Sequence, residues 1–140
     1  MGRLTIRGLD QLIADMEAHG DDIDGLAERM CLAAGETMKQ KWEFHVLKED
    51  LIDKGDLFNS IGYPPRSKTR IDQRTIETYP RGKNRRGVRN AEVAFIHHYG
   101  APKRNIKARH FVDRVETDSE DVIPNQIEQM FDSELKKRGL

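Results

Sequence analysis

The sequence has little of several features that mark particular classes of protein. It holds one cysteine, Cys31, in 140 residues, which excludes an internal disulfide and a zinc site built from several cysteines. No segment approaches the ~18 consecutive apolar residues of a membrane span, and no apolar signal region follows Met1. Aromatic residues are 6% of the chain, few for a protein that stacks single-stranded bases. We therefore expect a protein made in a reducing cytosol, with no membrane contact.

The net charge is zero, but the charges are distributed unevenly along the chain. Residues 1–63 carry 7 basic and 13 acidic side chains, residues 64–114 carry 14 and 4, and residues 115–140 carry 3 and 7. Such asymmetry bears on partners more than on fold. The basic middle meets nucleic acid or an acidic protein, or it meets acidic helices of its own chain or of other copies. A solvated loop without a partner is the third alternative.

Length and composition fit one modest core. A chain of 140 residues suits a single domain, so we expect residues 1–140 to form one. The apolar share is 36% and the charged share is 34%, against a usual charged share of ~25%. The surface is therefore expected to be heavily charged.

The clearest element is a long amphipathic helix over about 21–47. Its apolar side chains recur at spacings of three and four, the period of one helix face. This stripe consists of Ile23, Ala27, Met30, Ala34, Met38, Trp42 and His45. Gly35 costs ~1 kcal/mol relative to alanine in mid-helix, so it indicates a close packing contact or a bend.

A short helix, a further short helix or turn, and a C-terminal helix are predicted after the long helix. Asp56 is expected to cap a short helix over about 57–61. Residues 108–115 predict a short helix or turn. Asp118 or Ser119 then caps a C-terminal helix with Pro124 in or near its first turn, where proline is tolerated.

Strand formers are concentrated in three places. Leu4 to Ile6 and parts of 66–79 favour strands, and residues 91–99 predict another that is apolar on both faces. Such a strand is normally covered on both faces. The second cover is another subunit, the 57–61 helix or the C-terminal helix. The predicted fold is α+β, with the long helix and the C-terminal helix packed on an antiparallel β-sheet of three to four strands.

No group of residues carries an enzyme signal above background. His97 and His98 are adjacent, so in a strand they face opposite sides and do not share a metal. The carboxylates Asp50, Asp53 and Asp56 come closest to a metal nuclease, but Gly55 indicates a turn there. We expect no catalytic residue, no metal ligand and no cofactor, and histidines that form hydrogen bonds or line an interface. A nuclease or toxin-like enzyme is a remote third alternative.

Residues of about 80–90 are predicted to form an exposed basic loop that contacts DNA or protein. Its candidate contact residues are Arg81, Lys83, Arg85, Arg86 and Arg89. Cations of this kind give salt-sensitive binding that ignores base sequence. A DNA-binding module that uses the basic segment 64–114 is therefore the main alternative function, although no helix-turn-helix, zinc-finger or RNA-recognition signature accompanies it.

Three stretches resemble motifs of a known group of proteins. Residues 54–61 (KGDLFNSI) resemble a Thr-Gly-x-Leu-x-x-Ser-Ile motif, with Lys54 in place of the threonine. Residues 95–100 (FIHHYG) resemble an apolar segment that ends in aromatic-Gly, and residues 106–112 (IKARHFV) resemble Pro-Ala-Arg-Pro-Phe-Leu. In this order, between a long amphipathic helix and a terminal one, they resemble the small tail-completion and neck proteins of tailed bacteriophages. Both the minor tail-component family and the virion-morphogenesis family share this pattern.

The resemblance implies a non-catalytic structural protein of a phage or prophage. Such a protein completes the tail or joins tail to head through ring-like contacts, and rings use heterologous contacts between copies. The implied partners are further copies of the chain and other tail or head-connector proteins, with non-specific contact to packaged DNA as an addition. The implied location is the virion, and the bacterial cytoplasm during assembly. Candidate interface residues are Phe58, Ile61, Tyr99, Gly100, Arg109 and Phe111.

Overall fold

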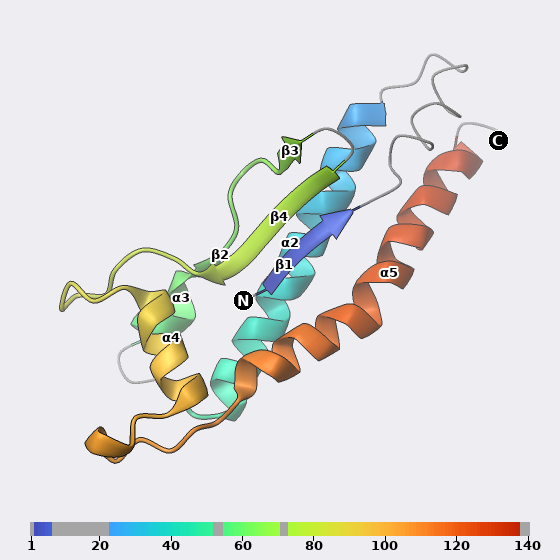
Figure 1. Ribbon diagram of the computed structural model, residues 1–140. Helices are drawn as coiled ribbons and strands as arrows, with labels where there is room; N and C mark the ends of the chain where they lie inside the picture. The colour runs from blue at the N-terminus through green and yellow to red at the C-terminus, as the bar shows by residue number, and fades with distance from the viewer. Residues whose placement is uncertain (1, 7–22, 52–54, 71–72, 138–140) are drawn as a thin grey trace.

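Two long helices and a small sheet make up most of the protein in the computed structural model, which describes residues 2–6, 23–51, 55–70 and 73–137 (Figure 1). The elements in chain order are β1 (Gly2–Ile6), α2 (Ile23–Lys48), α3 (Asp56–Ser60), β2 (Ile61–Gly62), β3 (Lys68–Arg70), β4 (Gln73–Pro80), α4 (Asn90–Tyr99), the 3-10 helix η1 (Pro102–Arg104) and α5 (Phe111–Lys137). This arrangement confirms the predicted α+β class, with its long helix and C-terminal helix.

Strand β4 is the centre of the sheet, and every pairing to it is antiparallel. β1 runs along one side, with Leu4 opposite Ile76. β2 and β3 pair with the two ends of β4, where Ile61 lies opposite Pro80 and Lys68 lies opposite Thr75. Alternate β4 side chains are buried, as expected when one face of a sheet is covered.

Helix α2 covers that face and comes very close to it at Gly35. A Cβ atom built on Gly35 would lie 3.0 Å from Ile76 Cδ1 and 3.1 Å from the Tyr63 ring. The Thr78 hydroxyl donates a hydrogen bond to the Gly35 carbonyl oxygen at 3.1 Å. Of the two explanations for this glycine, the structure therefore supports close packing.

A charged network joins the other end of β4 to α2. The guanidinium of the largely buried Arg74 donates to Glu28 Oε2 at 2.8 Å, and Ser67 also hydrogen-bonds to Glu28. Burial alone would raise the pKa of Glu28, but the hydrogen bonds from Ser67 and Arg74 outweigh it and hold that pKa below its usual value.

Helices α2 and α5 lie antiparallel and are joined by polar pairs along their length (Figure 1). His45 Nε2 lies 2.6 Å from Asp118 Oδ2, Thr37 Oγ1 donates to Gln126 at 2.7 Å, and Arg29 reaches Glu134 at 3.8 Å. Apolar side chains fill the space between these pairs, including Leu26 and Met30 against Ile127 and Phe131.

Residues 90–99 form a helix, and the prediction of a strand there was wrong. The buried side chains are Asn90, Ala94 and His98, at spacings of four, and Phe95 stacks on Tyr99 one turn apart. β-branched and aromatic residues suggested a strand, but strand preference depends on packing context. Residues 91–99 are therefore not a strand with two apolar faces, and that argument for a covering subunit no longer holds.

The C-terminal region also differs from prediction, because residues 111–137 form one continuous helix. Asp118 and Ser119 do not cap a separate helix: Asp118 pairs with His45, and the Ser119 hydroxyl donates to Val115 O at 2.7 Å. Pro124 lies inside α5 rather than in its first turn. Proline removes a backbone donor and bends a helix, and α5 changes direction about halfway along its length (Figure 1).

Cys31 is fully buried in α2, and burial raises the pKa of its thiol to about 11. A thiol in that state packs as a small apolar side chain rather than acting as a nucleophile. Within the described ranges, no helix combines the length and the apolarity needed to cross a membrane.

Candidate interaction surface and histidine cluster

The three motifs that carry the family resemblance meet at one end of the molecule. Leu57 and Ile61 of the first motif, Phe111 and Val112 of the third, and Ala94 from α4 belong to one core cluster with Trp42. Gly55, with φ of 83°, provides the turn that leads into α3. Asp56 is the first residue of α3 rather than its cap, and it pairs with Arg85 instead.

Gly100 connects the second motif to the third. Its φ of 80° and ψ of 168° lie in a region that is essentially restricted to glycine. After this turn the chain folds back, so that Arg109 N donates to His97 O and His110 N donates to His98 O, both at 3.0 Å. The third motif is therefore fastened to the end of α4 by backbone hydrogen bonds.

Arg109 and Arg114 tie this end of the molecule to the end of α2 through Glu49. Arg109 Nη1 donates to the Glu49 carbonyl oxygen at 2.8 Å and lies 3.5 Å from its carboxylate, which Arg114 also contacts. Arg109, one of the candidate interface residues, therefore fixes its loop by pairing with an acidic residue.

The candidate interface residues divide between surface and interior. Tyr99 is 66% exposed, Arg109 is exposed, and Phe58 and Gly100 are partly covered. Ile61 is 3% exposed and Phe111 is 0% exposed. These two side chains lie in the core, so they do not reach a surface where a partner would contact them.

The basic loop is exposed, as predicted, and it is held by a compact set of hydrogen bonds. The Asn84 side chain accepts hydrogen bonds from Arg86 N and Val88 N, and a β-bridge joins Lys83 to Arg89. Arg85 Nη2 donates to Asp56 Oδ1 at 2.8 Å, which anchors the loop to α3. The loop residues Arg81, Lys83, Arg86 and Arg89 are all exposed.

A pocket of about 310 Å³ opens beside this loop. Residues 84–88, α4 and the turn over 101–106 surround it, with Leu51 and Leu57 behind them. The pocket and its lining residue Arg104 were not among the predicted sites, because segments that are separate in the sequence form the pocket. The only signal in the sequence was the basic stretch 103–107.

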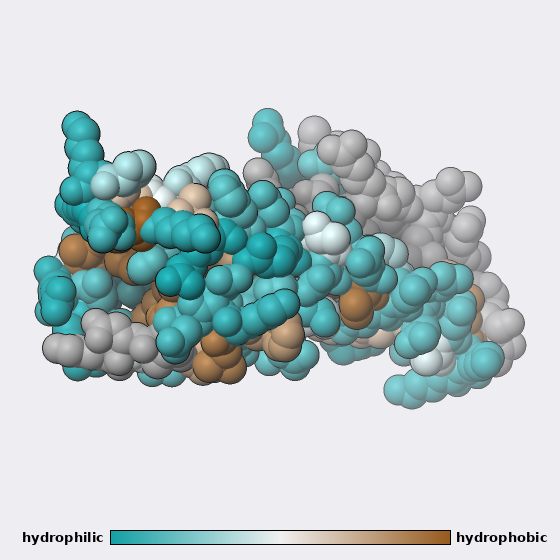
Figure 2. Space-filling view, turned by 90° about the horizontal axis from the view of Figure 1, so that it is seen from below, coloured by the Kyte–Doolittle hydropathy of each residue, from teal (hydrophilic) through white to brown (hydrophobic). Residues whose placement is uncertain are grey.

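Exposed apolar side chains are otherwise scattered over the described surface. In the view of Figure 2, hydrophilic side chains cover most of the face, and apolar ones form separate patches rather than one continuous area. The large exposed apolar residues are Phe44, Leu47, Val88, Tyr99 and Val122.

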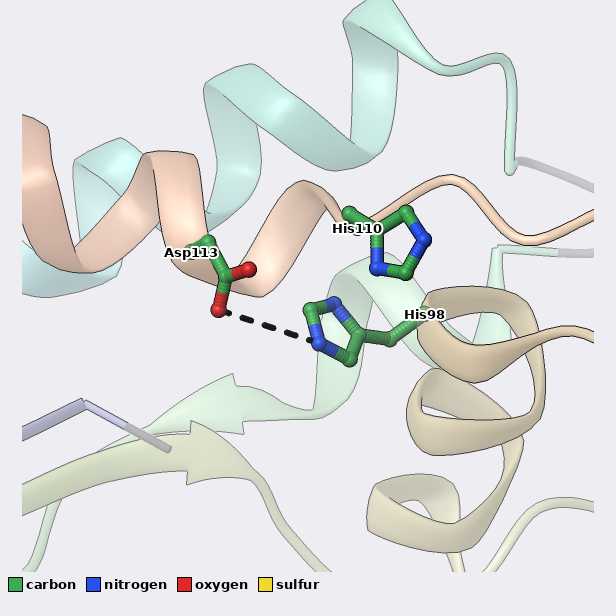
Figure 3. A group of neighbouring side chains, drawn as sticks. All are labelled: His98, His110 and Asp113. Carbon is green, nitrogen blue, oxygen red and sulfur yellow. Dashed lines mark ion pairs between the residues drawn. The ribbon is translucent and has the colours of Figure 1, made fainter.

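His98, His110 and Asp113 form the one group of possible metal ligands that the described residues contain (Figure 3). Their ligand atoms lie within 4.8 Å of one another, and His98 Nε2 lies 3.8 Å from Asp113 Oδ1. His98 is buried, whereas the other two residues are exposed. The positive φ of His110, 50°, places it at the turn into α5.

The hydrogen bonding of His98 does not fit a metal ligand. The Val112 N–H donates to His98 Nδ1 at 3.2 Å, so Nδ1 holds a lone pair. In the neutral ring the proton is then on Nε2, the atom that faces Asp113. A metal at Nε2 would need the ring proton on Nδ1. Two hydrogen-bond donors, Nδ1–H and the Val112 N–H, would then face each other. We therefore assign a structural role to this group, in which His98 Nδ1 accepts a hydrogen bond from the Val112 N–H in the first turn of α5.

The lowered pKa values of His98, which is buried, and His97, which is partly buried, predict that acid destabilises the protein. Burial lowers the pKa of His98 below its usual 6.5, with Asp113 opposing and His110 adding to the shift, and burial with the Arg109 charge lowers that of His97. The unfolded chain then binds protons that the folded chain rejects. We expect the free energy of unfolding to be unaffected by these groups above pH 6.5 and to fall as the pH drops below 6.5 toward the folded-state values.

Urea titrations between pH 5 and 8, followed by the fluorescence of the sole tryptophan, Trp42, measure this dependence. His98→Asn keeps an acceptor for the Val112 N–H without a titrating ring, so its stability should depend less on pH in this window. An unchanged pH dependence in His98→Asn would contradict the role given to His98.

The carboxylates considered for a nuclease are not assembled into a site by the described residues. Asp50 occupies a turn after α2, Asp56 pairs with Arg85, and Asp53 lies outside the described residues.

The chain was compared with models of known families, with curated proteins and with solved structures, and it matches none of them. The family resemblance therefore rests on the three motifs and their arrangement.

Proposed function

We propose that the chain is a non-catalytic structural protein of a tailed phage or prophage. It completes the tail or joins tail to head through ring-like contacts between copies, and it resides in the virion. The observation that carries the proposal is the convergence of the three motifs. Leu57 and Ile61 of segment 54–61 share a core cluster with Phe111 of segment 106–112. His98 of segment 95–100 also packs on Phe111, with ring centroids 6.2 Å apart.

The surface at this end of the molecule supports an assembly role. The motifs present exposed Tyr99 beside a turn that carries Lys103, Arg104 and Lys107. The basic loop and this turn border the same pocket beside α4. Aromatic and arginine side chains are the residues most enriched at protein interfaces. A charged and partly apolar end of this kind suits contacts with a neighbouring protein.

Removal of the gene from the phage or prophage that carries it tests the proposal. We expect electron microscopy to show filled heads and tails that are unjoined or of abnormal length. A tagged wild-type copy should restore joined particles and should be detected in purified virions. Normal virions without the protein would overturn the proposal.

A DNA-binding module is the second candidate, and the exposed cations favour it. The three residues of β3, including Lys68 and Arg70, are exposed, as are the arginines of the basic loop. Titration with duplex DNA at two salt concentrations tests this alternative. Tight binding that weakens steeply with salt, and that Arg86→Ala reduces, would favour DNA as the main partner.

A further inference from the structure

Helices α2 and α5 meet along a seam with a constant register (Figure 1). Four polar pairs fasten one side of the seam: Arg29–Glu134, Thr37–Gln126, His45–Asp118 and Glu49–Arg114. From each pair to the next, the step forward along α2 equals the step back along α5, as a regular antiparallel packing requires. The same register places Lys41 opposite Val122, between the second and third pairs. At this level the seam carries an apolar side chain, whereas the levels on both sides of it carry polar pairs.

Exposed apolar side chains flank the seam at this level. Val122 of α5 is 40% exposed, and Phe44 and Leu47 of α2 are each 55% exposed. Phe44 and Leu47 are three residues apart, so they share a helix face. The Phe44 ring lies against the His45 ring, with centroids 5.1 Å apart, and His45 in turn contacts Asp118, one turn before Val122. Phe44, Leu47 and Val122 are therefore treated as one surface, the seam patch.

Opposite charges border the seam patch on its two helices. Lys41 and Lys48 lie on α2, on either side of the exposed phenylalanine. Asp118 and Asp121 lie one turn apart on α5, and Val122 also lies one turn from Asp118. No ion pair between described residues includes Lys41, Lys48 or Asp121, and Asp118 pairs only with a histidine. The surface is thus apolar at its centre, basic on the α2 side and acidic on the α5 side.

We propose that the seam patch binds the seam patch of a second copy of the chain, about a two-fold axis parallel to the seam. Rotation about such an axis keeps the level of every residue along the seam and exchanges the two sides, so α2 of each copy lies across α5 of the other. The two lysines of one copy then face the two aspartates of the other. Phe44 comes within one helical turn of the level of the partner subunit's Val122. The contact is isologous, so each of these pairings occurs twice.

A second copy suits this surface better than other partners do, because the seam patch carries the complement of each of its own sides. Duplex DNA would meet Asp118 and Asp121 with its own negative charge. The acidic residues of α2 nearest the patch, Glu36 and Glu43, lie on the side of that helix away from α5, and Glu36 accepts a hydrogen bond from Tyr63. The contact goes beyond the proposed function and does not depend on it, because ring contacts are heterologous.

Charge reversal with rescue tests the contact. Sedimentation velocity over a range of concentrations should show the wild type in equilibrium between monomer and dimer. Lys41→Glu with Lys48→Glu, and separately Asp121→Lys, should each raise the dissociation constant at least about fivefold, because like charges then meet twice in each dimer. In a 1:1 mixture of these two variants every α2 faces an α5 of opposite charge, so dimers should return to near the wild-type level.

Two further mixtures check the geometry. Lys68→Glu with Arg70→Glu is the matched control: it changes the net charge as much as the lysine variant does, but on β3, so it should dimerise like the wild type and should not rescue Asp121→Lys. The lysine variant mixed with wild type should associate no more strongly than the wild type alone. Stronger association in that mixture would show that α2 pairs with α2, and would overturn the proposed arrangement.

Truncation of the apolar centre is an independent test. Phe44→Ser with Leu47→Ser should raise the dissociation constant at least about tenfold, because the apolar area buried in the dimer is lost. Val88→Ser removes an exposed apolar side chain of the basic loop instead, so it should leave dimerisation unchanged. Circular dichroism checks that every variant is folded, which the exposure of the substituted side chains favours.

Three results would overturn the contact: a wild type that stays monomeric, a mixture of the charge variants that fails to dimerise, or an apolar variant that dimerises like the wild type. Detection of the protein in virions tests the proposed function alone, because neither outcome there changes which variants dimerise in solution.

Discussion

Phe111→Ala is expected to lower the free energy of unfolding by about 3–5 kcal/mol, the usual cost of truncating a buried phenylalanine. Phe111 is 0% exposed and lies edge-on to Trp42, with ring centroids 5.9 Å apart and an interplanar angle of 82°. The cavity would open where α2, α4 and the start of α5 meet, which limits how far the surrounding side chains can close it. Urea denaturation followed by Trp42 fluorescence measures the loss.

Tyr99→Ala is the control, because Tyr99 and Phe111 were both candidate interface residues. Tyr99 is 66% exposed, so we expect its truncation to change stability by no more than about 0.5 kcal/mol. Equal losses in both variants would show that Phe111 is not the core residue described. If Tyr99 lies in an interface between copies, its variant should instead change association, which depends on protein concentration.

Gly100→Ala is expected to destabilise the protein by about 2–4 kcal/mol, from backbone strain together with a steric clash. An alanine would have to adopt φ of 80° and ψ of 168°. Its Cβ would also lie 2.7 Å from Ala108 N and 3.1 Å from Ile106 O, both backbone atoms that cannot move independently. The fold-back that attaches residues 106–112 to α4 would be lost or displaced. The free energy of unfolding measures the effect.

Gly87→Ala is the comparison in which no clash occurs. Gly87 has the same φ of 80°, but no atom lies within 4 Å of the position its Cβ would take. Its substitution should cost only the strain of a left-handed residue, about 1 kcal/mol. If Gly100→Ala costs no more than Gly87→Ala, the close approach to Ala108 does not matter for stability.

The mistaken strand at 91–99 shows the limit of local preference. Valine, phenylalanine, isoleucine and tyrosine favour strands, and nothing nearby in the sequence opposes that preference. The helix is decided by distant partners. Asn90 donates to the Arg81 carbonyl oxygen, Ala94 fits against Leu57 and Phe111, and His98 receives the Val112 N–H. The spacing of four between these buried residues was present in the sequence, but small and polar residues do not make an apolar stripe.

Only part of the candidate site was predicted, again because contacts between distant segments are not visible in the local sequence. The exposed basic loop and the glycine turns at Gly55 and Gly100 follow from local composition and turn chemistry, whereas the partner of Arg109, Glu49, is 60 residues away. The pocket between the loop, α4 and residues 101–106 does not, because its lining comes from segments that are brought together only by packing. The same packing places Ile61 and Phe111 inside, since the sequence shows that a residue is apolar but not which neighbour covers it.

The sequence by itself determined the α+β class, the long helix α2, the strand β4 and the division of charge along the chain. These features depend on residue period and composition, which are local properties. Tertiary structure alone decided that residues 90–99 are helical, that α5 is continuous through Pro124, and that Arg86 and Arg104 border one apolar pocket. Each of these depends on burial between segments distant in sequence, and the free energy of that burial exceeds the small local preferences that the sequence displays.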